Sequence, residues 1–276
     1  MIENILNTQG PEDIESEKFK HVPVLISNFS AIRKNPEISP VVSELPNDFY
    51  NKESRRHSFE EARDAFEFVF DKEKLLYHLE QKENEESLAY IKQVRRCGLS
   101  LRDLYRFFDV SHRCVEKLYK LMPLLCKYKD NYWGSPQEEI KKEIFENLDD
   151  LEFPINFGED SKFKEYVKNV LLEIKQLLME KQLPVEKFHT LRKRIRLFAS
   201  LVQPAAAENC GGNFHWLFFS LFKLSEEMGD HHDDLVSRGL NGEINYSESI
   251  VNVSPYIVSE FEKLKPFIER VCGLAE

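Results

Sequence analysis

Apolar residues recur at three- and four-residue spacing from residue 58 to the end of this 276-residue chain, and this periodicity restricts the fold to packed helices. In the stretch after Ser87, for example, Leu88, Ile91, Val94 and Leu101 fall on one helix face. Only 10 residues are glycine, about half the usual share of roughly 7%, which disfavours turn-dense β folds and glycine-rich nucleotide loops. We therefore predict an all-α protein.

The periodicity divides into eight helical stretches, four on either side of an interruption at residues 153–158. Ser58 and Glu61 form a capping box, because each side chain can accept a hydrogen bond from a backbone N–H at a helix start. Pro136 suits the first turn of another helix. The predicted helices cover residues 59–82, 87–108, 111–130, 136–150, 161–181, 184–203, 214–240 and 254–272.

The N-terminal segment differs from the rest of the chain. Residues 1–57 contain several prolines and few aromatic residues, so we expect an extended or mobile arm there, with 21–29 as a short apolar run able to dock on the body. We expect a first four-helix bundle at 58–152 and a second at 153–276, related by an internal repeat with pseudo-twofold symmetry.

Two of the predicted helices carry rows of basic side chains. The formal net charge is −10, yet residues 91–130 hold ten basic and four acidic side chains, and residues 187–196 hold five basic and none acidic. Each row occupies a sector of about 100–120° on its helix. The first row is Lys92, Arg95, Arg96, Arg102 and Arg106, and the second is His189, Arg192, Lys193 and Arg196. An offset of 97 residues aligns Lys92 with His189 and Arg95 with Arg192.

Like charges on one helix face repel, so a row of cations indicates a bound anion that offsets the repulsion. Arginine offers paired donors to phosphate oxygens, lysine a point charge, and histidine a donor that titrates near neutral pH. If a pseudo-twofold axis relates the two helices, their rows line one groove. A linear chain of phosphates fits such a groove.

The two basic segments resemble the repeats of the CHAD domain family. The second repeat of the family is similar to residues 189–198, HTLRKRIRLF, together with residues 224–236, LSEEMGDHHDDLV. A diverged first repeat is similar to residues 88–108, LAYIKQVRRCGLSLRDLYRFF. The resemblance spans about residues 59–274. It implies two four-helix bundles related by a pseudo-twofold axis, with a basic channel that binds inorganic polyphosphate.

Carried over by position, the resemblance makes His189, Arg192, Arg196, Arg95 and Arg102 phosphate-facing residues. The chain departs from the family pattern at four places, which predicts weaker binding or a different anion. These are Lys92 in place of the first histidine, Leu99 at the position equivalent to Arg196, and Leu197 and Ala199 where further basic residues are common.

The helix that follows each basic helix ends in a similar sequence, which is a second sign of an internal repeat. An offset of 103 residues aligns Leu125, Cys126 and Asp130 with Met228, Gly229 and Asp233. We expect each aspartate to pair with an arginine of the neighbouring basic helix and to fix its rotamer, rather than to act in catalysis.

Other functions are compatible with parts of the sequence. The run from His231 to Asp234 suggests a metal-dependent HD-type phosphohydrolase. Such a metal site also needs an earlier histidine, which His189 or His215 could supply, and a later aspartate. No aspartate follows Asp234, so this last ligand is missing. A basic groove accepts nucleic acid, although Tyr105, Phe107 and Phe108 read as core residues rather than as a stacking platform. An acidic protein, or the acidic arm 1–57 itself as an autoinhibitor, is a further candidate partner.

Common catalytic signatures are absent from the sequence. No Walker pattern, no G-x-S-x-G and no E-x-E-x-K strand occurs. We predict a non-catalytic binding module, and we assign no catalytic residue, metal ligand or cofactor.

Five cysteines are scattered without a CxxC pair, which is typical of reduced thiols. They are Cys97, Cys114, Cys126, Cys210 and Cys272. No 18-residue apolar run is present, and the first residues lack a secretory signal pattern. We expect a cytoplasmic protein without a membrane span. Association with polyphosphate granules would be compatible with this location. The sequence leaves the oligomeric state open.

Overall fold

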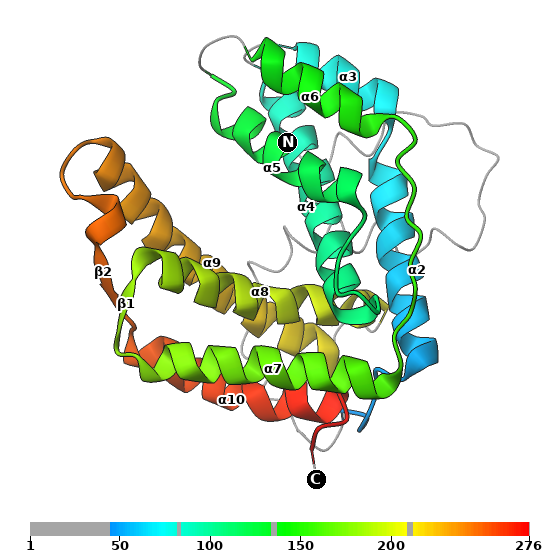
Figure 1. Ribbon diagram of the computed structural model, residues 1–276, viewed down its shortest axis with the longest axis vertical. Helices are drawn as coiled ribbons and strands as arrows, with labels where there is room; N and C mark the ends of the chain where they lie inside the picture. The colour runs from blue at the N-terminus through cyan, green and yellow to red at the C-terminus, as the bar shows by residue number, and fades with distance from the viewer. Residues whose placement is uncertain (1–44, 82–83, 134–136, 209–211, 276) are drawn as a thin grey trace.

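The computed structural model describes residues 45–81, 84–133, 137–208 and 212–275, and most of them are helical (Figure 1). The all-α prediction is therefore confirmed. A two-stranded antiparallel sheet, in which Leu183 is opposite Val251, was not predicted. The elements are α2 (Lys52–Val69), α3 (Lys72–Glu80), α4 (Glu85–Phe108), α5 (Glu116–Asp130), α6 (Glu138–Leu148), α7 (Asp160–Met179), β1 (Gln182–Pro184), α8 (Val185–Glu208), α9 (Asn213–Leu240), the 3-10 turn η4 (Tyr246–Glu248), β2 (Ile250–Asn252) and α10 (Pro255–Val271).

The first predicted helix, 59–82, is two helices, and it begins earlier than its apolar pattern indicates. The Asn51 side chain caps α2 by accepting hydrogen bonds from the backbone N–H groups of Glu53 and Ser54. Ser58, the predicted cap, is instead buried in mid-helix. Extended backbone at Phe70 then ends α2, and Asp71 caps α3.

The predicted boundary of the N-terminal arm at residue 57 is wrong, because residues 45–51 pack on the second half of the chain. Tyr50 is fully buried, and its hydroxyl donates to the carbonyl of Leu201 in α8. The backbone N–H groups of Asp48 and Tyr50 donate to carbonyls at the end of α10. Residues 52–57 form the first turns of α2. Residues 1–44 of the predicted arm, including the apolar run 21–29, lie outside the described residues.

The remaining helix boundaries are close to prediction, with local exceptions explained by capping. Asn84, rather than Ser87, caps α4. α5 begins at Glu116, five residues later than predicted, because Asp109 caps a turn through Ser111 and His112 takes a left-handed conformation. α8 continues past the predicted end at 203, with Pro204 inside the helix.

The helices form two groups that meet where α4 crosses α8. Helices α2 to α6 lie on one side of the crossing and α7 to α10 on the other, and the groups diverge as a V (Figure 1). α8 packs along α9, and α4 packs between α2 and α5. The buried apolar side chains of both groups form one continuous cluster.

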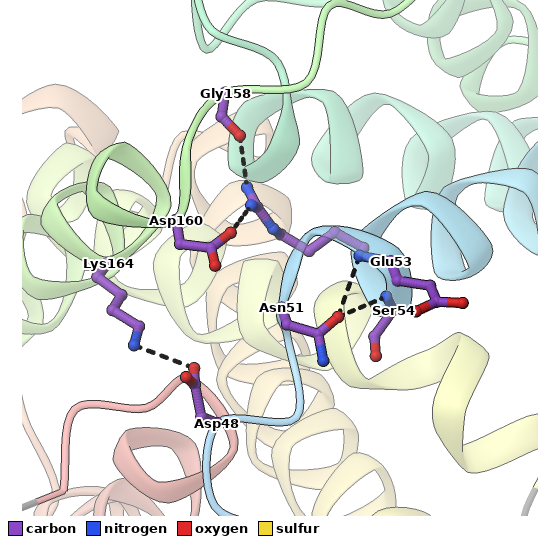
Figure 2. Close-up of polar contacts among 8 residues, drawn as sticks. Asp48, Asn51, Glu53, Ser54, Gly158, Asp160 and Lys164 are labelled. Atoms are coloured by element: carbon purple, nitrogen blue, oxygen red, sulfur yellow. Dashed lines mark hydrogen bonds and ion pairs between the residues drawn. The ribbon is translucent and has the colours of Figure 1, made fainter.

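A buried arginine joins the two groups. Arg55 of α2 is 0% exposed; it donates to the carbonyl of Gly158 at 3.1 Å and pairs with Asp160 at the start of α7. Its guanidinium lies 5.1 Å from the ring centre of Phe163. Burial lowers the pKa of Arg55, whereas Asp160 raises it. Figure 2 shows this junction and the neighbouring ion pair between Asp48 and Lys164, 3.1 Å apart.

None of the described helices combines the length and apolar character that a membrane span requires. Four of the cysteines carry free thiols, namely Cys97, Cys114, Cys126 and Cys272, and Cys210 lies outside the described residues. Burial raises the pKa of Cys97 to about 12. This thiol is therefore protonated at neutral pH, as expected of a packing residue.

Candidate anion-binding site

The crossing of α4 and α8 brings the two predicted basic rows together at their C-terminal ends. Ser200 of α8 donates to a carboxylate oxygen of Asp103 of α4 at 3.3 Å, and Ser100 of α4 donates to Gln203 of α8 at 2.8 Å. From this crossing the N-terminal parts of both helices run outward along the two sides of the V (Figure 1). The predicted rows lie on those N-terminal parts and at the crossing itself.

Lys193 of α8 lies within the electrostatic reach of the α4 cations. Burial lowers the pKa of Lys193, and so does the charge of Arg196, one turn along the same helix. Arg102 and Arg106 of α4 lower the pKa of Lys193 as well. Cations of both helices therefore influence the same side chain.

Arg196 occupies the centre of this group. Burial lowers its pKa, the carboxylate of Asp103 raises it, and the charges of Arg102 and Arg95 of α4 lower it. The Nε atom of Arg196 is buried and has no hydrogen-bond partner among the described residues, and the same holds for Nε of Arg95. Both guanidinium groups thus keep donor capacity that protein atoms do not use.

Arg192 is held in place from α9. Its Nε donates to the backbone carbonyl of Ser225 at 3.1 Å. Its guanidinium lies against Gly229, where a Cβ atom would come within 2.3 Å of Nη2. Glycine at this position therefore makes room for the arginine. The sequence alignment marked Gly229 as a small residue but did not reveal which side chain it faces.

The carboxylate of Asp103 organises the α4 side of the group. It is 1% exposed, lies 2.8 Å from Nη2 of Arg102 and 3.6 Å from Nη1 of Arg106, and accepts the Ser200 hydroxyl. Asp103 follows Arg102 directly, so no spacing pattern in the sequence singles it out. We name Arg95, Arg102, Arg106, Arg192, Lys193 and Arg196 the cationic cluster.

Four members of the cationic cluster have no carboxylate within ion-pair distance among the described residues: Arg95, Arg192, Lys193 and Arg196. One buried aspartate against six cations leaves a strong positive excess. Three predicted residues lie outside the cluster: Lys92 and Arg96 are exposed on α4, and His189 is half-buried on α8. The cluster is suited chemically to binding a multiply charged anion.

His189 lies at the outer end of the α8 row. Its ring stacks on that of His232 of α9, with centroids 4.5 Å apart, and its Nδ1 is buried without a hydrogen-bond partner. His232 in turn contacts the Tyr246 hydroxyl at 2.8 Å. Burial, followed by the charges of Lys193 and other neighbours, lowers the pKa of His189 to about 4. The imidazole is therefore neutral at pH 7.

The predicted pairing of Asp130 and Asp233 with arginines is wrong. Asp130 pairs with the adjacent Lys129 at 2.6 Å and accepts a contact from Cys126, and Asp233 contacts His232 at 3.2 Å. Both aspartates are exposed to solvent, and each contacts the residue directly before it rather than an arginine of the basic helix. A backbone carbonyl, rather than a carboxylate, fixes the Arg192 rotamer.

The departures from the CHAD pattern are largely core positions. Leu197 and Ala199 are buried, and Leu99 is half-buried. A cation at either buried position would face the apolar interior. Tyr105, Phe107 and Phe108 are also buried, as predicted, and so offer no surface for stacking bases.

Although His232 stacks on His189, no three donor atoms of the His231–Asp234 run, His189 and His215 come close enough in the described residues to hold a metal ion. Within the described ranges, one set of three donor groups lies close enough to hold an ion, and it consists of other residues on α2 and α8. Neither a family model, nor a curated protein, nor a solved structure matches this chain. The resemblance to the CHAD family therefore stays a prediction.

Proposed function

We propose that this protein binds inorganic polyphosphate, without catalysing its breakdown, at the cationic cluster. The observation that carries the proposal is the crossing of α4 and α8, where the Asp103 carboxylate of α4 contacts both Ser200 of α8 and Arg102. This crossing brings cations of the two helices together, and four of them have no carboxylate within ion-pair distance among the described residues. Six cations with one buried carboxylate repel one another, and a polyanion relieves that repulsion. Guanidinium groups donate paired hydrogen bonds to phosphate oxygens.

The extent of the basic row favours a chain of phosphates over a single one. His189 and Arg196 are seven residues apart, which corresponds to about 10 Å along a helix. The cations of α4 extend the row beyond the crossing. A linear ligand with one charge on each unit contacts all of these positions, whereas a single phosphate contacts only some of them.

We also propose that α4 and α8 are equivalent helices of a duplicated four-helix unit, as in the CHAD family. At the 97-residue offset, residues 93–101 and 190–198 have the same succession of buried, half-buried and exposed positions. The same offset pairs Asp103 with Ser200, and these two side chains touch, as equivalent residues beside a twofold axis do.

The second correspondence supports the same duplication. Arg95 lies close enough to Cys126 to lower the pKa of that thiol, which burial raises. Arg192 lies against Gly229. Arg95 and Arg192 are equivalent at one offset, and Cys126 and Gly229 at the other, so a duplication predicts that the two pairs lie close together in the same way.

A salt series tests the proposed function. We expect the logarithm of the polyphosphate affinity to fall linearly with the logarithm of salt concentration, with a slope of about −3 to −5, because each neutralised phosphate releases counterions. Isothermal titration of the full chain at several salt concentrations, from roughly 50 to 300 mM NaCl, measures this slope. Undetectable binding at the lowest salt, or a slope near zero, would contradict the proposal.

Binding should also take up a proton at His189. The pKa of free His189 is about 4, lowered by burial and by Lys193, His232, Arg192 and Arg196. A phosphate that neutralises these cations raises this pKa in the complex. Affinity is then constant above the raised pKa, increases by at most about tenfold per pH unit as the pH falls through it, and levels off below about 4.

Titrations from pH 5 to 8 in parallel with His189→Gln measure this effect. The variant should bind with an affinity that does not depend on pH in this range, because glutamine donates a hydrogen bond without titrating. Equal pH profiles for the two proteins would remove His189 from the contact.

Gly229→Ala tests the position of Arg192 without changing any charge. The new Cβ atom would lie 2.3 Å from Nη2 of Arg192, and the flexible guanidinium must move to relieve the clash. We expect polyphosphate affinity to fall by about three- to tenfold while the fold is kept, since a displaced arginine loses part of one charge-assisted contact.

A double-mutant cycle isolates this effect. In an Arg192→Ala background, Gly229→Ala should cause no further loss, because the side chain that it displaces is gone. An equal loss in both backgrounds would mean that alanine acts through the packing of α9 rather than through Arg192.

A further inference from the structure

A second group of chemically active side chains lies at the junction of α2 and α8, away from the cationic cluster. His57 and Glu61 are one turn apart on α2, and Glu208 is the last residue of α8. Their donor atoms all lie within 4.8 Å of one another. His57 Nε2 already contacts a carboxylate oxygen of Glu208. Glu208 is twelve residues from Arg196, which corresponds to about 18 Å along α8.

The position of Glu208 at the end of α8 favours a bound cation. A helix C-terminus carries the negative end of the helix dipole, so a carboxylate there is unfavourable unless positive charge lies nearby. Glu61 brings a second carboxylate to the same place. The negative potential reaches inward as well, because Glu208 is among the causes that raise the pKa of buried Tyr50, after burial itself and Cys272.

The donor set favours a particular class of ion. One imidazole nitrogen and two carboxylate oxygens are ligands that zinc accepts, whereas calcium and magnesium prefer oxygen ligands alone. A histidine and an acidic residue at positions i and i+4 of a helix place both donors on one face. His57 is exposed, with 55% of its side chain accessible, so water can complete the coordination.

We propose that His57, Glu61 and Glu208 bind a divalent transition-metal ion, with zinc as the best match. Two ligands come from α2 and one from α8, so the ion links the first group of helices to the second. It also offsets the paired carboxylates at the end of α8. This site is independent of polyphosphate binding, because it shares no residue with the cationic cluster.

Isothermal titration of the full chain with zinc chloride, in the absence of polyphosphate, tests the proposal. We expect one zinc ion per chain at this site, and at least tenfold weaker binding in His57→Ala and in Glu208→Gln. Glu60→Gln is the matched control, because it removes one negative charge from an exposed position of the same helix and should leave zinc binding unchanged.

Three results would overturn the proposal. The first is no zinc binding by the unaltered chain at millimolar concentration. The second is full affinity in both His57→Ala and Glu208→Gln. The third is zinc binding that His232→Ala abolishes and the α2 and α8 variants retain, because that would place the ion beside α9. Thermal unfolding of each variant without zinc confirms that it is folded.

Discussion

Replacing Arg192 and Arg196 together by alanine should weaken polyphosphate binding by a hundredfold or more. Each arginine donates hydrogen bonds to phosphate oxygens, and a hydrogen bond to a charged group is worth about 1.5–3 kcal/mol. Two such losses amount to about 3 kcal/mol or more, and each 1.4 kcal/mol corresponds to about a tenfold change in affinity. Isothermal titration at low salt measures the change directly.

Arg194→Ala with Arg238→Ala is the matched control. It removes the same charge, and Arg194 belongs to the same helix, but Arg194 pairs with Glu173 at 2.7 Å and Arg238 lies near the end of α9 beside Asp234 and Glu243. We expect at most a few-fold loss from the lower net charge. Equal losses in the two double variants would mean that net charge alone attracts the anion.

Arg55→Met should lower the free energy of unfolding by about 3 kcal/mol, the largest stability effect that we expect from a single polar residue. Removing one partner of a buried ion pair costs about 3–5 kcal/mol, because the other groups are left without a partner. The lower end applies here, since 49% of the Asp160 side chain is exposed and water can solvate it. The Gly158 carbonyl loses its donor as well. Urea denaturation measures the difference.

The neighbouring Arg56→Met is the control for this prediction. Arg56 is exposed and lies 5.9 Å from the ring of Phe157, so its loss should change the free energy of unfolding by no more than about 0.5 kcal/mol. A similarly small effect of Arg55→Met would show that the junction between α2 and α7 does not depend on the buried guanidinium.

The helices were predictable because their apolar stripes repeat over many turns, as the extents of α7, α9 and α10 show. The first residues of the helices were harder to predict. Asn51 and Asn84 cap α2 and α4, although Ser58 and Ser87 have the same local chemistry, and tertiary packing decides between such candidates. The docking of Tyr50 on α8 depends on a contact between residues 151 positions apart, which no local pattern reveals.

The candidate site was predictable to the extent that a helix face fixes which side chains are neighbours. Arg192, Lys193 and Arg196 share a face of α8 for that reason. Their proximity to Arg102 and Arg106 depends on the crossing of α4 with α8. That crossing could be predicted only from the internal repeat. The contacts of Arg192 with α9 and of His57 with Glu208 join segments far apart in the chain, so no local sequence pattern predicts them.

The most direct test is a competition titration of the unaltered protein, in which long-chain polyphosphate competes with duplex DNA, single-stranded RNA and ATP at one salt concentration. If cations from α4 and α8 together hold a linear chain of phosphates, polyphosphate displaces both nucleic acids, and ATP, with three phosphates, competes weakly. Preferential binding of DNA or RNA, or ATP binding as tight as that of polyphosphate, would contradict that account.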